Sequence, residues 1–277
     1  MKSKKIVIGL TGSKGVIGKY FQKQYSEYKF DKFAGDIQDY KDVQNWIKKT
    51  KASAIIHLAA KVPTDYVKKN YKKSLKTNFT GTVNVIKAMI REKKTPWFFF
   101  SSTSHVYSPT HKKLKETDKI KPFSLYGKTK VYAEKYLLKK IKDNKIKICI
   151  GRIFSFTHPT QKVSFVIPSL NKKIKSLKNK ILYLDNINHE RDFLHVNDIC
   201  RSINFLFKKR STGIFNIGSG ERTTLVQVVK LLNKNKDKKI IYKNGFKKTS
   251  IVANVNKIKR LGFKPNFNIK KIISEFR

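Results

Sequence analysis

The sequence is poor in the residues that build disulfide frameworks, thiolate metal sites and membrane spans. It has 277 residues but only two cysteines, Cys149 and Cys200, both in apolar surroundings and without metal-type spacing. We therefore expect two buried thiols in a reduced, cytoplasmic protein, and no metal site. No apolar run approaches the ~20 residues of a membrane-spanning helix. The apolar run that follows the basic N-terminus is also too short for a signal peptide.

Acidic residues and arginine are scarce as well. The chain has 18 Asp and Glu against 63 Lys and Arg, which gives a formal charge of +45. Such a charge suggests a nucleic-acid partner, yet only eight of the basic residues are Arg, the side chain suited to bidentate contacts with bases and phosphates. The lysines are spread over every segment, with no arginine stripe interleaved with aromatic residues. We expect no specific nucleic-acid partner, and a charge that attracts anionic substrates.

What the chain does contain is a glycine turn between a strand pattern and a helix pattern near the N-terminus. Residues 6–10 form a short apolar run typical of a buried parallel strand, and a helical pattern runs from 16 towards 25. Gly12, Gly15 and Gly18 recur every three residues between and within these patterns. Such glycines allow a sharp turn, close approach of a phosphate and tight packing of the helix. This context favours a dinucleotide site over a turn without function.

Strand and helix patterns continue to alternate, which predicts an α/β fold with a Rossmann-type, doubly wound parallel sheet. The predicted strands cover residues 28–31, 54–60, 97–100 and 146–150, and the predicted helices include those that start near 39 and 126. Beyond this the pattern is mixed, with helices at 165–174, 196–207, 225–232 and near the C-terminus, and strands at 181–184 and 214–217. We expect a dinucleotide-binding domain over 1–154 and a smaller mixed α/β substrate region over 155–277, some segments of which return to the main sheet.

A group of polar residues along the chain is suited to proton transfer. Hydroxyl groups follow the strand at 97–100, at the edge where parallel sheets place their chemistry. Tyr126 and Lys130 are four residues apart and share one face of a helix. A cation beside a phenol favours its ionised form, so Tyr126 could act as acid or base, with Thr103 on the same substrate oxygen. In a lysine-rich chain, however, this spacing alone also fits a solvated helix face.

In this order the motifs resemble the extended short-chain dehydrogenase/reductases, the NAD-dependent epimerase/dehydratase family that works on nucleotide sugars. The resemblance covers nearly the whole chain. The segments that carry it are 11–18, 35–39, 57–60, Asn78 with Gly81 and Thr82, 101–103, 126–130 and 191–199.

The resemblance implies roles for individual residues. Thr103, Tyr126 and Lys130 would be catalytic. The residues that would hold NAD or NADP are Gly12, Gly15, Val16, Ile17, Gly18, Asp36, Ile37, Leu58, Ala59, Ala60, Tyr126 and Lys130. A nucleotide-diphosphate sugar would contact Thr103, Ser104, His105 and Arg191, with Arg191 on its diphosphate; a salt bridge from Arg191 to Glu190 or Asp192 is the alternative.

The choice between NAD and NADP is left open by two neighbouring residues. Asp31 lies ~20 residues past the glycine turn, where an acid would hold an adenosine ribose 2′-OH, although a surface acid is nearly as plausible. Lys32 beside it favours a 2′-phosphate instead.

Departures from the family pattern narrow the reaction. Family 4,6-dehydratases carry an acidic residue two positions after the threonine, where this chain has His105. Ser155 and Ser108 replace residues that are often Asn and Gly, and the segment 155–168 partly resembles GDP-4-keto-6-deoxymannose reductases. We expect a nucleotide-sugar epimerase or 4-keto-reductase that transfers hydride at the hexose, at C4, and we allow for a homodimer. The alternatives are a dehydratase in which His105 replaces the usual acid, and a non-catalytic basic binding protein on a Rossmann scaffold.

Overall fold

The computed structural model describes residues 5–143, 146–176, 181–185, 187–234, 239–243 and 248–276. The chain forms two compact units. The first contains Met1–Tyr107, Lys119–Ile153 and Cys200–Phe215, and the second contains Ser108–Asp118, Phe154–Ile199 and Asn216–Arg277. Two segments therefore cross the boundary expected near residue 154, because 108–118 belongs to the second unit and 200–215 to the first.

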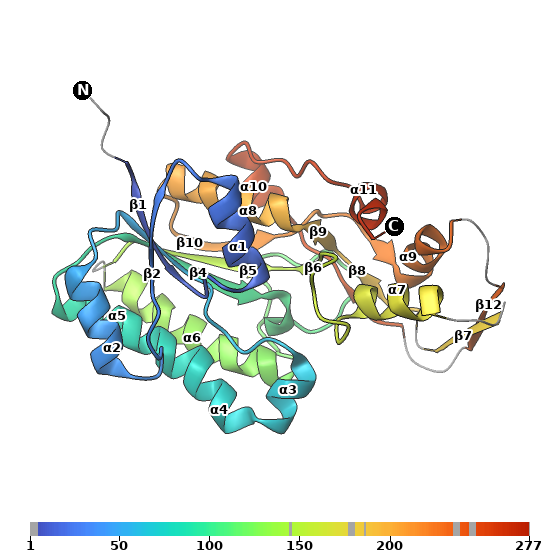
Figure 1. Cartoon of the computed structure of the whole chain (residues 1–277), viewed down its shortest axis with the longest axis horizontal. Helices are drawn as coiled ribbons and strands as arrows, with labels where there is room; N and C mark the ends of the chain where they lie inside the picture. The colour runs from blue at the N-terminus through green and yellow to red at the C-terminus, as the bar shows by residue number, and fades with distance from the viewer. Residues whose placement is uncertain are drawn as a thin grey trace. The chain divides into compact units, whose positions relative to one another are not determined.

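A six-stranded sheet in the order β10-β5-β4-β3-β1-β2 forms the centre of the first unit (Figure 1). Its strands are β1 (Val7–Thr11), β2 (Lys29–Lys32), β3 (Ala54–His57), β4 (Trp97–Thr103), β5 (Ile148–Ile153) and β10 (Gly213–Ile217). Strand β1 pairs in parallel with β2 on one side and with β3 on the other, so the chain order reverses at β1. Open parallel sheets bind ligands at the carboxyl ends of their strands where this reversal occurs. The glycine turn follows β1 at that point.

Helices cover both faces of this sheet, which confirms the predicted doubly wound fold (Figure 1). Helices α2 (Tyr40–Lys49), α5 (Gly81–Arg91) and α6 (Leu125–Lys142) lie on one face, and α1 (Val16–Gln24) with the end of α8 (Val196–Lys208) on the other. Side chains alternate along β4 because successive strand residues point to opposite faces. Phe98 and Phe100 join the core under the first group, whereas the Trp97 ring lies 5.6 Å from that of Phe207 in α8.

Several predicted elements have shifted ends, and the strand pairing explains two of them. The strand predicted over 54–60 ends at His57, because its partner β1 ends at Thr11, opposite His57. The strand predicted over 97–100 continues to Thr103, because β5 pairs with it as far as Ile153. Asp39 caps α2 as expected, and its carboxylate accepts a bond from the Asp42 N–H at 3.1 Å.

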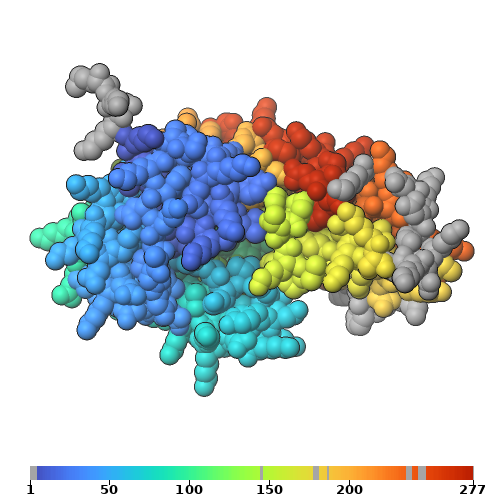
Figure 2. Space-filling view, in the orientation of Figure 1, coloured from blue at the N-terminus to red at the C-terminus, as the bar shows by residue number. Residues whose placement is uncertain are grey.

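Short helices connect β3 to α5. They are α3 (Thr64–Lys69), α4 (Tyr71–Leu75) and a π-helical turn (Lys76–Thr80), and a 3₁₀ turn (Ser104–Val106) follows β4. In the space-filling view the cyan segment that contains α3 and α4 forms a protruding part of the first unit's surface (Figure 2). Neither cysteine forms a disulfide, and both are buried as expected.

The second unit is a mixture of short strands and helices. Its sheets are β6 (Ser155–Thr157) with β9 (Phe193–His195), β7 (Ile181–Asp185) with β12 (Lys239–Lys243), and β8 (Glu190–Arg191) between β11 (Thr223–Thr224) and β13 (Ser250–Ile251). Its helices are α7 (Val166–Ser176), α9 (Leu225–Leu232), α10 (Asn256–Arg260) and α11 (Ile269–Ser274). The predicted helix over 225–232 begins at a capping box, in which Thr224 and Gln227 bond each other's backbone N–H. In the described ranges, no helix has the length and apolar character that crossing a membrane requires.

A buried ion pair joins β5 to α6 in the first unit. The side chains of Arg152 and Glu134 are 2% and 3% exposed, and an Arg152 nitrogen donates to Glu134 Oε2 at 2.7 Å. The same guanidinium donates to the Tyr107 hydroxyl at 2.8 Å, and the Ser102 hydroxyl bonds the carboxylate. Ser102 and Tyr107 flank residues 103–106, so the pair holds both ends of this segment.

We predict that Glu134→Gln lowers the free energy of unfolding by about 3–5 kcal/mol, because it leaves the buried guanidinium without its counter-charge. Urea denaturation measures this loss. The double variant Glu134→Met/Arg152→Met removes both charges and should regain part of the stability. A double variant as unstable as the single one would show that packing, and not charge, sets the cost.

Candidate functional site

The glycine turn after β1 brings three backbone segments into close approach. Gly12 has a φ of +70°, and an added Cβ would lie 2.7 Å from the Ala59 nitrogen and from the Leu58 carbonyl carbon. A Cβ on Gly18 would lie 2.5 Å from the Gly12 carbonyl oxygen. Side chains at these two positions would therefore separate the turn from the end of β3 and from α1.

Gly15 differs from the other two glycines because its added Cβ would face nearly open space. The nearest atom is the Gly12 carbonyl oxygen, at 3.3 Å. Gly15 is also the N-cap of the nine-residue helix α1, which has no side-chain cap and no acidic residue in its first turn. The positive end of a helix with open space before it is suited to an anion. These residues leave room for a pyrophosphate group, and the predicted contact with it stays a prediction.

A chain of buried hydrogen bonds fixes the segments around this turn. The Ala59 N–H donates to Thr11 Oγ1 at 3.2 Å, and Thr11 Oγ1 bonds His57 Nδ1 at 2.9 Å. On the other side of the ring, His57 Nε2 bonds Thr82 Oγ1 at 3.1 Å, and this hydroxyl donates to the Asn78 carbonyl at 2.8 Å. Because the Thr82 proton is used, Nε2 must donate. Burial and then the charge of Lys130 lower the pKa of His57 to about 3, which keeps the ring neutral.

Asn78 continues this chain of bonds to helix α6. The oxygen of its side-chain amide accepts from the Lys61 N–H at 2.7 Å, and the nitrogen of the same side chain donates to the Lys61 carbonyl at 3.0 Å. It also donates to Thr129 Oγ1 at 3.0 Å, and this hydroxyl donates to the Tyr126 carbonyl at 2.7 Å. Asn78 and Thr82 were recognised in the sequence only as parts of matching motifs; their role in joining the turn to α6 was missed.

The structure brings Tyr126 and Thr103 together, as predicted. Helix α6 begins at Leu125, so Tyr126 lies in its first turn, and its phenol lies close enough to the Thr103 side chain for Thr103 to lower the phenol's pKa. Gly127 allows this approach, because an added Cβ would lie 2.2 Å from the His105 carbonyl oxygen. Burial raises the pKa of the Tyr126 phenol, and the nearby Thr103 side chain opposes this only in part. The lowered phenol pKa that the sequence suggested is therefore wrong for this structure, since desolvation dominates.

Lys130 is buried one helical turn further along α6. Its Nζ donates to the Ser101 carbonyl at 2.8 Å and lies 4.6 Å from the centre of the Phe100 ring. Burial lowers the pKa of Lys130 from 10.5 to about 7, although the charge of Glu134 opposes the shift. With only 1% of its surface exposed, Lys130 does not belong to a solvated helix face.

The 3₁₀ turn after Thr103 places His105 beside Tyr126. The two ring centres are 5.6 Å apart in an edge-to-face arrangement, and the Phe123 ring lies 4.3 Å from the imidazole. His105 Nδ1 bonds Ser124 Oγ at 2.9 Å, and the same oxygen caps α6. Ser104 is buried in the same turn.

The residues expected near an adenosine have local partners. Asp36 is exposed, and its carboxylate accepts from the Gln38 N–H at 2.9 Å. Ile37 is buried, and its carbonyl accepts from the Asn84 amide at 3.2 Å. The Asp31 carboxylate accepts from the Trp46 indole N–H at 2.9 Å, so it is not a solvated surface acid.

Arg191 lies in the second unit, and neither of its acidic neighbours in the sequence pairs with it. Its guanidinium donates to the Glu190 carbonyl at 2.8 Å and to Thr249 Oγ1 at 3.1 Å. The Glu190 carboxylate instead pairs with Arg222 at 2.6 Å, and Asp192 accepts bonds from three backbone N–H groups. Burial lowers the pKa of Arg191. Within the ranges that the structure describes, this half-buried cation has no ion pair, and the predicted salt-bridge alternative is wrong.

The chain matches one protein family over most of its length and resembles several enzymes that act on nucleotide sugars by name. A family model described as GDP-mannose 4,6 dehydratase matches residues 10–276. The chain is 29% identical over 196 residues to ADP-L-glycero-D-manno-heptose-6-epimerase of Brachyspira hyodysenteriae, covering 68% of this chain and 60% of the relative. It is 27% identical over 191 residues to GDP-6-deoxy-D-mannose reductase of Pseudomonas aeruginosa, covering 65% and 62%. The match thus spans less than two thirds of either relative's length.

Solved structures show the same fold over nearly the whole chain. The protein RMD from Pseudomonas aeruginosa, solved in complex with NADPH, superposes with a TM-score of 0.88 at 21% identity. The superposition covers 98% of this chain and 97% of that chain.

We predict that Lys130 makes the stability of the protein rise with pH between about 7 and 10.5. In this window the unfolded chain binds a proton that the folded chain does not, so alkali favours folding by about 1.4 kcal/mol per pH unit at most. Lys130→Met lacks this contribution. The difference in unfolding free energy between the two proteins, measured in urea across the window, should change with pH. Parallel curves would mean that Lys130 keeps its ordinary pKa in the folded protein.

Proposed function

The chain belongs to the NAD-dependent epimerase/dehydratase family of extended short-chain dehydrogenase/reductases, and we propose that it is a nucleotide-sugar epimerase or 4-keto-reductase. The observation that carries the proposal is the group formed by Thr103, Tyr126 and Lys130. Thr103 ends β4 and lies near enough to Tyr126 to lower the pKa of its phenol, while Lys130 bonds the carbonyl of Ser101, two residues earlier on the same strand. All three side chains are buried at the edge of the sheet that carries the glycine turn.

The fit of the glycine turn to a pyrophosphate supports NAD or NADP as the cofactor. When bound, a nicotinamide dinucleotide supplies or accepts the hydride. Gly15 and the first turn of α1, including Val16 and Ile17, would hold its pyrophosphate. The part-buried residues 58–60 would lie along it, and Asp36 with Ile37 would frame its adenine. The proposal covers both cofactors, because Asp31 is bonded to Trp46 and a cationic Lys32 lies beside it.

The raised pKa of Tyr126 indicates that this residue acts first as a proton donor. A phenol that burial holds protonated is a proton donor, which suits the reduction of a keto sugar to an alcohol. Tyr126 would protonate the sugar oxygen as hydride reaches the carbon, at C4 of the hexose, and would take the proton back in the reverse direction. Thr103 would hold the same oxygen. An ammonium group at Lys130 would assist ionisation of the phenol.

The surroundings of Arg191 support the proposal that the substrate carries a diphosphate. A half-buried guanidinium without a carboxylate partner is stabilised by an anionic ligand, and guanidinium groups bind phosphate through paired hydrogen bonds. The diphosphate of a nucleotide sugar would provide this charge. The relatives named as a heptose 6-epimerase and a deoxymannose reductase act on sugars linked to a nucleoside diphosphate, in keeping with this substrate class.

A dehydratase remains the second candidate because of His105. Its ring lies against Tyr126 and is held by Ser124, so an imidazole stands close to the proposed proton donor. His105 could then exchange the proton that water elimination requires. Product analysis separates the candidates, since a dehydratase forms a keto-deoxy sugar without reduced cofactor. We extend the proposal to a cytoplasmic enzyme, in keeping with two thiols that form no disulfide; the homodimer stays a prediction.

Gly15→Val tests the cofactor site. The branched side chain would enter the open space before α1, so dinucleotide binding should weaken at least ~10-fold, with about 1.4 kcal/mol for each factor of ten. The fold should survive, because only the Gly12 carbonyl oxygen, at 3.3 Å, lies within 4 Å of the added Cβ, and a shift of a few tenths of an ångström relieves this contact. Isothermal titration with NAD and NADPH measures the affinity. A folded variant with unchanged affinity for both would place the cofactor elsewhere.

Tyr126→Phe tests the catalytic assignment. The ring and its packing remain, so the fold and cofactor binding should persist, whereas turnover should fall by about 10²–10⁴-fold. Turnover is measured on a panel of nucleotide sugars, with and without reduced cofactor. Tyr132→Phe, on the exposed side of the same helix, serves as the matched control. Near-normal turnover of Tyr126→Phe on the true substrate would rule out the assignment.

Arg191→Ala tests the diphosphate contact. Loss of a charge-assisted hydrogen bond costs about 1.5–3 kcal/mol, so substrate KM should rise ~10-fold or more, with cofactor affinity nearly unchanged. Arg260→Ala, at an exposed arginine of the same unit, should leave both values unchanged. If Arg191→Ala weakens substrate and cofactor equally, the residue supports the fold.

A further inference from the structure

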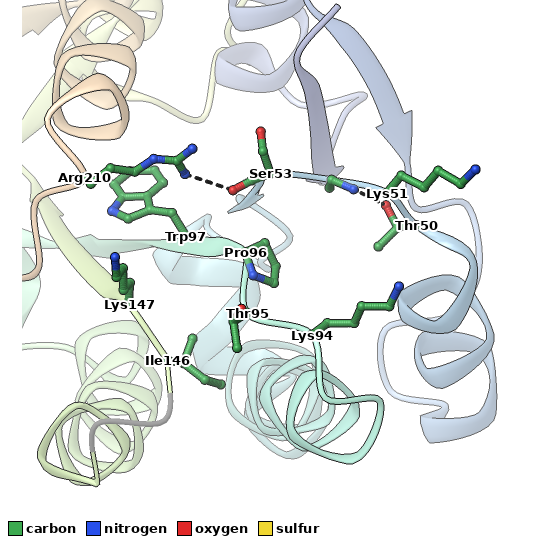
Figure 3. Close-up of a pocket in the computed structure, with 11 residues that line it drawn as sticks. Thr50, Lys51, Ser53, Lys94, Thr95, Pro96, Trp97, Ile146, Lys147 and Arg210 are labelled. Carbon is green, nitrogen blue, oxygen red and sulfur yellow. Dashed lines mark hydrogen bonds between the residues drawn. The ribbon is translucent and has the colours of Figure 1, made fainter. Parts of the chain in front are cut away.

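A cavity lies at the edge of the central sheet opposite the glycine turn. Its volume is about 700 Å³, and its lining includes Ser53, Pro96 and Lys147, the residues immediately before β3, β4 and β5 (Figure 3). It therefore lies at the amino ends of these strands, whereas the glycine turn and Tyr126 lie at their carboxyl ends. None of the residues assigned to the cofactor or to the sugar nucleotide lines this cavity.

Four cationic side chains line the cavity, one from the loop that enters each of four adjacent strands. In the order β10-β5-β4-β3 they are Arg210, Lys147, Lys94 and Lys51. Neighbouring strands are ~4.8 Å apart, so the loops that carry this row span about 14 Å. We call these four residues the cation row. No acidic residue is among the residues that line the cavity.

The acidic residues closest in sequence to the cation row are already paired. The Glu92 carboxylate, two residues before Lys94, accepts from the Gln44 amide at 2.7 Å. Asp143 pairs with Lys140 at 3.2 Å. Neither carboxylate lines the cavity, so the cation row presents its charge without an internal counter-ion.

Arg210 comes from the loop before β10, but its side chain reaches the opposite end of the row, at the entry to β3. Its guanidinium donates to the Ser53 carbonyl at 2.9 Å and lies 4.6 Å from the Phe207 ring centre, and Figure 3 shows it extending past Trp97 towards Ser53. Its backbone has a φ of +49°, which favours glycine. An arginine here costs backbone energy that a glycine would avoid, which suggests a use for its side chain.

We propose that this cavity binds a linear oligophosphate, a chain of at least three phosphate groups without attached bases. Lys147, Lys94 and Lys51 come from three successive loops along one direction, with the Arg210 guanidinium beside the last of these loops. This arrangement matches a ligand with a charge at each successive unit better than it matches a single compact anion. A nucleic-acid strand would also need an exposed ring on which bases stack. The aromatic residue in the lining, Trp97, is 1% exposed, and its indole N–H donates to the Ser211 carbonyl at 2.7 Å. The proposal does not depend on the enzyme activity.

The test compares two double variants with the same loss of charge. Lys94→Gln/Lys147→Gln removes two members of the cation row, and Lys41→Gln/Lys87→Gln removes two exposed lysines of α2 and α5 outside the cavity. Isothermal titration with tripolyphosphate should show about 10-fold weaker binding for the first pair, since exposed ion pairs contribute up to ~1 kcal/mol each. The second pair should match the unmodified protein. Equal effects, or no effect of the first pair, would overturn the proposal, because diffuse charge or the glycine turn would then bind the anion.

A second comparison distinguishes the effect of losing the Arg210 side chain from the effect of relieving its backbone conformation. Lys93 has the same φ of +49° as Arg210 but does not line the cavity. Lys93→Gly and Arg210→Gly relieve the same backbone conformation, and only Arg210→Gly should weaken tripolyphosphate binding, by about 5-fold. Orthophosphate should bind far more weakly than tripolyphosphate. If a single-stranded oligothymidylate of equal charge binds more tightly and loses this in Lys94→Gln/Lys147→Gln, the ligand is a nucleic acid and the proposal is wrong.

Discussion

The first unit depends on a buried chain of hydrogen bonds that joins five structural elements, β1, β3, the π-helical turn, α5 and α6. It starts at Thr11, the last residue of β1, passes through His57 and Thr82, and reaches helix α6 through Asn78 and Thr129. A buried polar group left without a partner costs about 1–3 kcal/mol, so each member fixes the position of the next. The glycine turn and the first turn of α6 are therefore set relative to each other by the protein itself, before any ligand binds.

Burial has opposite effects on the two ionisable groups of α6. It raises the pKa of Tyr126 because the phenolate loses hydration, and it lowers that of Lys130 because the ammonium does. Both shifts disfavour charge. A ligand that supplies an opposite charge would favour ionisation of either group, which links proton transfer to an occupied site. The ion pair of Glu134 and Arg152 stabilises the strand segment beside them without exposing charge to solvent.

The cations that give the chain its net charge of +45 are distributed differently at the two edges of the central sheet. At the carboxyl edge the chain offers backbone N–H groups, hydroxyls and one buried lysine. At the amino edge each of four adjacent loops carries a cation, and the lining of the cavity there contains no acid. A lysine-rich composition alone does not place cations side by side at one edge of the sheet. Their arrangement there depends on the order of the strands, which sets the positions of the loops that carry them.

The sequence by itself determined the doubly wound fold, the glycine turn, the cap at Asp39 and the helix that carries both Tyr126 and Lys130, since these depend on local periodicity and turn chemistry. Only the tertiary structure decided where β3 and β4 end, because pairing with β1 and β5 sets those limits. Strands of two or three residues, such as β8 and β6, are too short for periodicity to reveal. The pKa shift of Tyr126, the partner of Asp31 and the isolation of Arg191 from carboxylates also required it. Burial and non-local contacts, which no stretch of sequence contains, fix all three.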